Sequence, residues 1–246
     1  MKIAGSLRSI LFSACFGLAA LGAAGAQELP VDDRTSDIHG LKLGMVADDM
    51  DTRGYGEFAC GSNGGAPRAQ LTDWTEFKKC RPEPNGLYEV YVRIDDQVEY
   101  LSKAYDDPTI ATNKRGTTVA GHPVILSVLF DKDGVGRMIR FVTDPRADVS
   151  ARRVAQLLRI TVSNQYGPRG WECKDIPPQE GESPVGGVFH HSFCVKKFAG
   201  KTITILAKFF RKPGQADIDP VTKQYHAGYF ESSTRVEIFD DTVKTQ

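Results

Sequence analysis

The segment 124–142, VILSVLFDKDGVGRMIRFV, decides the fold because it contains two apolar runs on either side of Asp131-Lys132-Asp133-Gly134. Runs rich in β-branched and aromatic residues are typical of strands. An Asp-Gly pair between them indicates a tight turn, since it suits two turn positions with positive φ. We therefore predict an antiparallel hairpin with strands over 124–130 and 135–142.

Asp131 and Asp133 in the hairpin loop also suggest a calcium-binding loop as an alternative. An EF-hand requires a third acidic or amide ligand, a later Glu and flanking helices. The loop lacks that third ligand, and Arg137 and Arg140 stand where oxygen ligands are needed. The sequence therefore favours a turn.

Further strands and one main helix are predicted on both sides of this hairpin. The helix begins at Asp148 or Ser150, has apolar residues at helical spacing through Tyr166, and ends at Gly167-Pro168. A much shorter helix is predicted at 48–51, whose Asp residues suit a helix start. Strand patterns occur at Leu87–Ile94, Val98–Leu101, Trp171–Cys173, Val188–Val195, Thr202–Phe210 and Tyr229–Phe239.

The two halves of the chain follow a similar order of elements. Phe58-Ala59-Cys60 corresponds to Trp171-Glu172-Cys173, and a second cysteine, Cys80 or Cys194, follows each after a loop. This repetition predicts an α+β fold of two tandem units, 38–145 and 146–246, each with a helix packed on an antiparallel β-sheet.

The N-terminus has the three zones of a secretory signal peptide. Lys2 and Arg8 precede an apolar run from Ile10 to Leu21, and Ala24-Gly25-Ala26 is a small-x-small cleavage site. We predict cleavage after Ala26, a flexible segment at 27–37, and a periplasmic or secreted protein. The alternative is a lipoprotein box at Ser13-Ala14-Cys15, which is less favoured because the long apolar run follows Cys15.

The charge balance and the cysteines indicate which kinds of ligand and which cellular compartment the protein is suited to. Residues 27–246 contain 29 Lys and Arg against 31 Asp and Glu, which argues against binding to nucleic acid. No second apolar stretch is long enough to cross a bilayer. Four cysteines in an exported chain indicate disulfides, and three pairings are possible. Spacing favours the local pairs Cys60–Cys80 and Cys173–Cys194. A zinc site is disfavoured, because no two cysteines have the close C-x₂₋₄-C spacing of zinc ligands.

Candidate catalytic and metal-binding residues give no specific constellation. His190-His191 is the most noticeable feature, but adjacent residues of a strand point to opposite faces and could not easily share a metal. The same reasoning separates Ser192 from His191, and His39, His122 and His226 are isolated. Neither a nucleophile elbow nor a phosphate-binding loop is present. We therefore assign no catalytic, cofactor-binding or metal-binding residue.

One resemblance adds to this interpretation. Leu41-Lys42-Leu43-Gly44-Met45, followed by acidic residues, resembles the L-G-M opening of small exported bacterial modules related to β-lactamase inhibitor protein and to the BamE/SmpA outer-membrane lipoproteins. Tandem helix-plus-sheet units, each with a disulfide, are also similar to the β-lactamase inhibitor protein fold. The resemblance implies a scaffold that binds other proteins.

The sequence thus predicts a periplasmic, non-enzymatic binding protein whose partner is another protein or a component of the cell envelope. The alternatives are an exported hydrolase with a site formed by distant residues, and a small-molecule binding module. Aromatic side chains of the first half, most of which carry a polar tip, are candidate anchors for a partner, although each is also an ordinary core residue. They are Tyr55, Phe58, Trp74, Phe77, Tyr88, Tyr91, Tyr100 and Tyr105.

Overall fold

The computed structural model describes residues 38–94, 117–147, 149–212 and 230–243. The predicted signal peptide, the segment 27–37 and the predicted strand Val98–Leu101 lie outside these ranges. The strands are β1 (Tyr55–Cys60), β2 (Gln70–Leu71), β3 (Tyr88–Ile94), β4 (Thr118–Val119), β5 (His122–Phe130), β6 (Gly136–Thr143), β7 (Glu172–Asp175), β8 (His190–Phe198), β9 (Lys201–Phe210) and β10 (Glu231–Asp240). The helices are η2 (Ala47–Asp49), η3 (Trp74–Lys79), α3 (Val149–Arg153), η4 (Ala155–Leu157) and α4 (Leu158–Gln165), where η marks a 3₁₀ helix.

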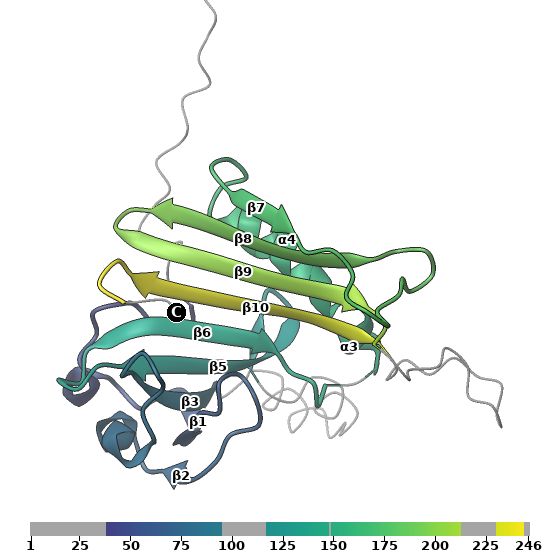
Figure 1. The fold of residues 1–246 in the computed structure, drawn as a ribbon. Coiled ribbons are helices and arrows are strands. Elements are labelled where there is room, and N and C mark those ends of the chain that lie inside the picture. The colour runs from purple at the N-terminus through teal and green to yellow at the C-terminus, as the bar shows by residue number, and fades with distance from the viewer. Residues whose placement is uncertain (1–37, 95–116, 148, 213–229, 244–246) are drawn as a thin grey trace, which may run out of the picture. The chain divides into compact units, whose positions relative to one another are not determined.

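Nine of these strands form one continuous antiparallel sheet in the order β2-β1-β3-β5-β6-β10-β9-β8-β7, and β4 pairs with β5. Figure 1 shows β6 beside β10 near the middle of this sheet. Across that pair, Ile139 lies opposite Ile238 and Phe141 lies opposite Val236. Hydrogen bonds of one sheet therefore connect the ranges 38–145 and 146–246.

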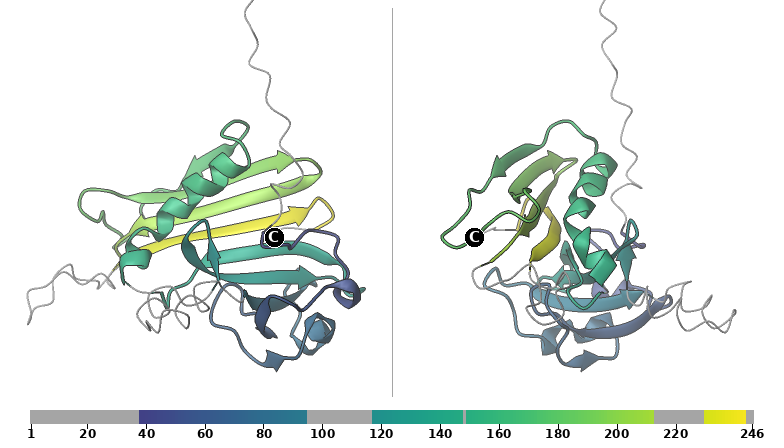
Figure 2. Two further views of the ribbon diagram at one scale, coloured as in Figure 1. Left: turned by 180° about the vertical axis from the view of Figure 1, so that it is seen from behind. Right: turned by 90° about the vertical axis from the view of Figure 1, so that its right-hand side faces the viewer.

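The predicted fold of two helix-on-sheet units is wrong. In the range 146–246, α3, η4 and α4 follow one another and cover one face of the sheet (Figure 2), here called the helix face. The described part of the range 38–145 contains only the 3₁₀ helices η2 and η3. The acidic segment at 48–51 cannot extend into a longer helix, because Gly54 follows with φ +84° and a helix cannot continue through that conformation.

Aromatic residues replace a helix on the first half of the helix face. Trp74 and Phe77 of η3 are buried, and the Trp74 ring packs edge-on against Phe58 with centroids 4.8 Å apart. In the second half, Leu158, Val162 and Tyr166 bury the inner side of α4. All these residues belong to one apolar cluster that includes Ile203, Ile205 and Val236. The core is therefore continuous beneath both halves of the sheet.

The predicted hairpin is confirmed as β5 and β6, but its turn differs. Gly134 has φ +81°, whereas Asp133 does not have a positive φ. The register shifts between Leu129 and Phe130, so the connection is a bulged turn and not a two-residue turn. The Asp131 carboxylate stabilises it by accepting hydrogen bonds from the backbone N–H groups of Asp133 and Val135, at 2.9 and 3.0 Å.

The four cysteines form two disulfides, Cys60–Cys80 and Cys173–Cys194, which are the local pairs that the spacing favours. The first connects the end of β1 to the residue after η3, and the second joins directly opposite residues of β7 and β8. Disulfides persist in oxidising compartments, so they fit an extracellular or periplasmic protein. Among the described helices, none combines the length and the apolar character needed to cross a bilayer.

Candidate functional site

The main candidate site is a pocket of about 350 Å³ beside the Cys60–Cys80 disulfide. Residues 60–63, 68–69 and 79–83 form its walls, and Glu89 of β3 also lines it. A volume of this size is in the usual range for small-molecule sites. We call this the disulfide pocket.

The loop that forms one wall of the pocket depends on Gly61. A Cβ atom at this position would lie 2.3 Å from the Cδ atom of Glu89, a contact that cannot be accommodated without displacing the Glu89 side chain. The Gly61 N–H donates to the Glu89 carbonyl oxygen at 2.9 Å. The next turn of the loop is held by Ser62, whose hydroxyl donates to the Ala66 carbonyl oxygen at 2.7 Å. The loop is thus fixed directly against β3.

Beneath the pocket lies a buried charge cluster on the face of the sheet opposite the helix face. Its centre is Arg140 of β6, whose side chain is only 4% exposed. Its Nη1 and Nη2 atoms donate to the two carboxylate oxygens of Glu83, at 2.6 and 2.9 Å. Its Nε atom donates to Glu237 Oε1 at 2.8 Å, and Nη1 is 3.2 Å from Glu89 Oε1. One guanidinium group therefore holds three carboxylates.

A second arginine ties this cluster to the pocket loop. Arg235 Nη2 is 2.7 Å from Glu237 Oε1, and Arg235 Nη1 donates to the Asn63 carbonyl oxygen at 2.9 Å. On the other side of the loop, the Asn63 N–H donates to Glu89 Oε2 at 2.5 Å. Hydrogen bonds thus connect the loop to both β3 and β10.

Within the cluster, the pKa values of Arg140 and Glu237 are shifted in the direction of ionisation. Burial alone would lower the pKa of Arg140, but the hydrogen bonds to Glu83 and the charges of Glu89 and Glu237 outweigh burial and raise it. Burial likewise opposes ionisation of Glu237, yet the charges of Arg235 and Arg140 hold the pKa of Glu237 below its usual value. Both shifts favour the charged forms, so Arg140 and Glu237 are an ionised pair at neutral pH.

The lowered pKa of Glu237 predicts a stability loss in acid. A carboxylate with a lower pKa in the folded state stabilises the fold above its unfolded pKa of about 4.3, and this contribution is lost as the pH falls through the folded value. We expect the free energy of unfolding to fall as the pH is lowered from neutral to below the pKa of Glu237 in the folded state. In the variant Glu237→Gln this fall should be smaller, as measured by urea denaturation at each pH. An equally steep fall in Glu237→Gln would contradict the assignment.

The mouth of the pocket carries cations. Arg68, Lys79 and Arg81 line it, and all three are exposed. Lys79 forms an ion pair with Glu76. Within the described ranges, no carboxylate pairs with the guanidinium group of Arg68 or of Arg81. Two arginines are therefore available to a ligand, above a cluster whose three carboxylates form ion pairs with Arg140.

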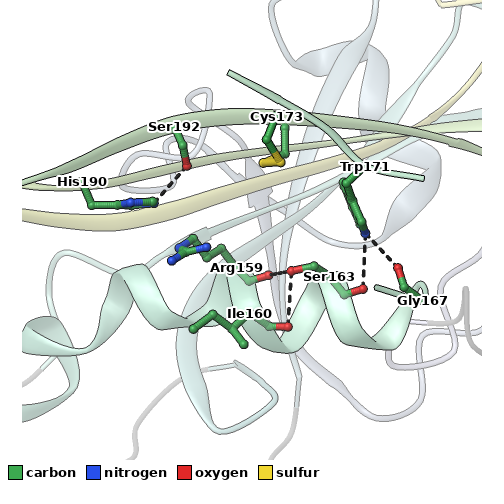
Figure 3. Close-up of a disulfide and its surroundings, with 9 residues drawn as sticks. Arg159, Ile160, Ser163, Gly167, Trp171, Cys173, His190 and Ser192 are labelled. Atoms are coloured by element: carbon green, nitrogen blue, oxygen red, sulfur yellow. Dashed lines mark hydrogen bonds between the residues drawn. A yellow bond between two sulfur atoms is a disulfide. The ribbon is translucent and has the colours of Figure 1, made fainter. Parts of the chain in front are cut away.

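The histidines and serine weighed from the sequence lie in the second half of the sheet. His190 Nε2 is 2.9 Å from Ser192 Oγ, whereas His191 packs on Phe210 with ring centroids 5.2 Å apart. The two histidines thus have different surroundings, in keeping with the alternation of a strand. From the sequence, Ser192 is compared with its neighbour His191. The hydrogen bond of Ser192 is instead made with His190, two positions away on the same face of the strand (Figure 3).

The aromatic residues expected as candidate anchors are largely core residues. Phe58, Trp74, Phe77 and Tyr91 are buried. Tyr100 and Tyr105 lie outside the described ranges. Of the isolated histidines, His39 Nε2 is 2.6 Å from the Thr118 carbonyl oxygen and His122 lines a small cavity of about 10 Å³. His226 also lies outside the described ranges. The disulfide pocket is therefore a better candidate binding site than these aromatic residues.

Two further observations bear on the function of the site. In the part of the chain that the structure describes, no group of three or more His, Cys, Asp or Glu side chains is arranged to hold a metal ion. Comparison of the whole chain with protein-family models, curated proteins and solved structures found no match. Function is therefore inferred from the geometry of the pocket alone.

Proposed function

We propose that the chain is an exported, non-enzymatic binding protein, and that the disulfide pocket receives an anionic component of the cell envelope. The observation that carries this proposal is the contrast between the mouth and the base of the pocket. Arg68 and Arg81 have no described carboxylate partner, whereas the carboxylates below them are held by Arg140. An acidic ligand would supply the missing partners.

The chemistry of arginine supports an anionic ligand. A guanidinium group presents several N–H donors in a fixed fork that matches carboxylate and phosphate oxygens. Ligand recognition also benefits from a site that is already organised before binding. Here the disulfide and the backbone hydrogen bonds of Asn63 hold the walls in place without a ligand. Gly61 contributes because the lack of a side chain lets the loop lie against Glu89.

Replacement of both mouth arginines tests the proposal. We expect the oxidised mature chain to bind citrate or glucose 6-phosphate saturably, and to bind glucose much more weakly. The double variant Arg68→Gln/Arg81→Gln should bind the anions at least about tenfold more weakly, because each charge-assisted hydrogen bond contributes about 1.5–3 kcal/mol. Isothermal titration calorimetry measures both affinities.

The matched control is Lys132→Gln. Lys132 lies in the β5–β6 turn, its side chain is 85% exposed, and it does not line the pocket. This variant removes a positive charge without touching the mouth, so it should bind the anions as the unchanged chain does. Equal binding by the double variant, or equal binding of glucose and the two anions, would overturn the proposal.

A further inference from the structure

A second polar site lies between α4 and β8, close to the Cys173–Cys194 disulfide. Figure 3 shows Arg159 reaching from α4 toward the strand that carries His190 and Ser192. His190 and Ser192 are two positions apart on β8, so both point to the helix face. The site is in the other half of the sheet from the disulfide pocket and is on the opposite face.

Arg159 has an unmet need for a hydrogen-bond acceptor. Its Nε atom is buried and makes no hydrogen bond. A buried N–H group of a cation without an acceptor is strongly unfavourable, so native proteins normally provide a partner, a water molecule or an ion. A partner for this atom is expected.

Within the described ranges, the charged groups nearby do not meet this need. Asp175 of β7 lies opposite Ser192 in the register, but it is exposed and makes no hydrogen bond to Arg159. Lys196, farther along β8, is itself a cation, and its Nζ atom already donates to the carbonyl oxygens of Tyr166, Gly167 and Arg169. Among the described residues, no carboxylate therefore pairs with Arg159.

Ser192 and His190 add two polar groups to this space. Ser192 Oγ is 2.9 Å from His190 Nε2, and Ser192 is only 4% exposed. Burial, and next the positive charge of Arg159, lower the pKa of His190, so its imidazole is neutral at pH 7. If the imidazole Nε2–H donates to Ser192 Oγ, the serine hydroxyl is free to donate to a third group. Arg159 on α4 and Ser192 on the facing strand (Figure 3) then each have a donor without an acceptor.

We infer that Arg159 and Ser192, oriented by His190, form a binding site for a small oxyanion, the shared chemistry of a carboxylate and a phosphate. The same residues do not form a catalytic triad, since Asp175 makes no hydrogen bond to His190. Deep burial of Ser192 also hinders its attack on a substrate carbonyl. An oxyanion satisfies the Arg159 Nε–H and needs only the two donors that the geometry supplies.

Nuclear magnetic resonance of the His190 ring in the oxidised mature chain tests this inference. Titration with sodium phosphate, and separately with sodium acetate, should shift the His190 resonances saturably. A bound anion should also raise the His190 pKa by roughly one pH unit, because an opposite charge nearby favours the imidazolium form. Saturation by only one of the two salts identifies whether phosphate or carboxylate is the ligand, and either result supports the site.

Three variants establish whether the anion binds beside Arg159. Arg159→Gln should abolish the saturable shift, whereas Arg153→Gln, an exposed arginine of α3, should leave it unchanged. Arg68→Gln/Arg81→Gln should also leave it unchanged, because those arginines belong to the disulfide pocket. Absence of a saturable shift, persistence of the shift in Arg159→Gln, or its loss in Arg68→Gln/Arg81→Gln would overturn the inference. The last result would leave the proposed function of the pocket intact.

Discussion

Replacing Arg140 by methionine should lower the free energy of unfolding by about 3–5 kcal/mol, the range observed when one partner of a buried ion pair is removed. Methionine preserves much of the volume of the arginine stem, so a large cavity is not the cause. The cause is electrostatic: Glu83, Glu89 and Glu237 remain close together, and their side chains are only 16%, 4% and 19% exposed. Urea denaturation at neutral pH, monitored by tryptophan fluorescence, measures the loss.

Arg137→Met is the matched control for this prediction. Arg137 lies on the same strand and also pairs with two carboxylates, those of Asp131 and Asp240, but its side chain is 33% exposed. Ion pairs that water can reach contribute at most about 1 kcal/mol, so this variant should be only slightly destabilised. If both variants lose the same small amount, burial of the Arg140 cluster is not what stabilises this face.

The local elements of the fold were predictable because their signals are short in sequence. The β5–β6 hairpin shows two apolar runs around Asp131–Gly134, and the helical segment shows Leu158 and Val162 at helical spacing. What the sequence could not show is which strand lies beside which. Joining β6 to β10 requires Phe141 to meet Val236, residues almost a hundred positions apart, and no local pattern encodes such a pair.

The incorrect two-unit prediction has a physical origin. The repetition of an aromatic residue and a cysteine in Phe58–Cys60 and Trp171–Cys173 suggested that each half has its own helix. In the first half, however, the buried rings of Trp74 and Phe77 cover the sheet from a single short 3₁₀ helix. Tertiary packing of large aromatic side chains thus replaced the helix that the repetition implied.

The candidate site could be predicted only in part. Arg140 is a signal that sequence reasoning can use, because a charged residue between apolar neighbours in a predicted strand is expected to have a buried partner. Its partners Glu83, Glu89 and Glu237 are scattered in sequence, so they could not be identified. Arg68 and Arg81 have no local signature at all, and only the folding of two loops around one disulfide brings them to the same pocket.

The Cys60–Cys80 disulfide should therefore affect both stability and ligand binding. Replacing both cysteines by alanine removes a crosslink between residues 20 apart, and should lower the free energy of unfolding by about 3 kcal/mol. The two residues line the pocket, and each adjoins one of its walls, 61–63 or 81–83. Without the crosslink, those walls are no longer held together, so citrate binding should weaken strongly even under conditions where the variant is folded.

The other disulfide provides the control that separates these two effects. Cys173→Ala/Cys194→Ala removes a crosslink of nearly the same span, 21 residues, and should destabilise the fold by a similar amount. Its cysteines lie on β7 and β8 and do not line the disulfide pocket. Calorimetry on the folded fraction should therefore show unchanged citrate affinity for this variant and reduced affinity for Cys60→Ala/Cys80→Ala. Equal affinities in the two variants would mean that the first disulfide contributes stability alone, and that the Arg140 cluster suffices to organise the pocket.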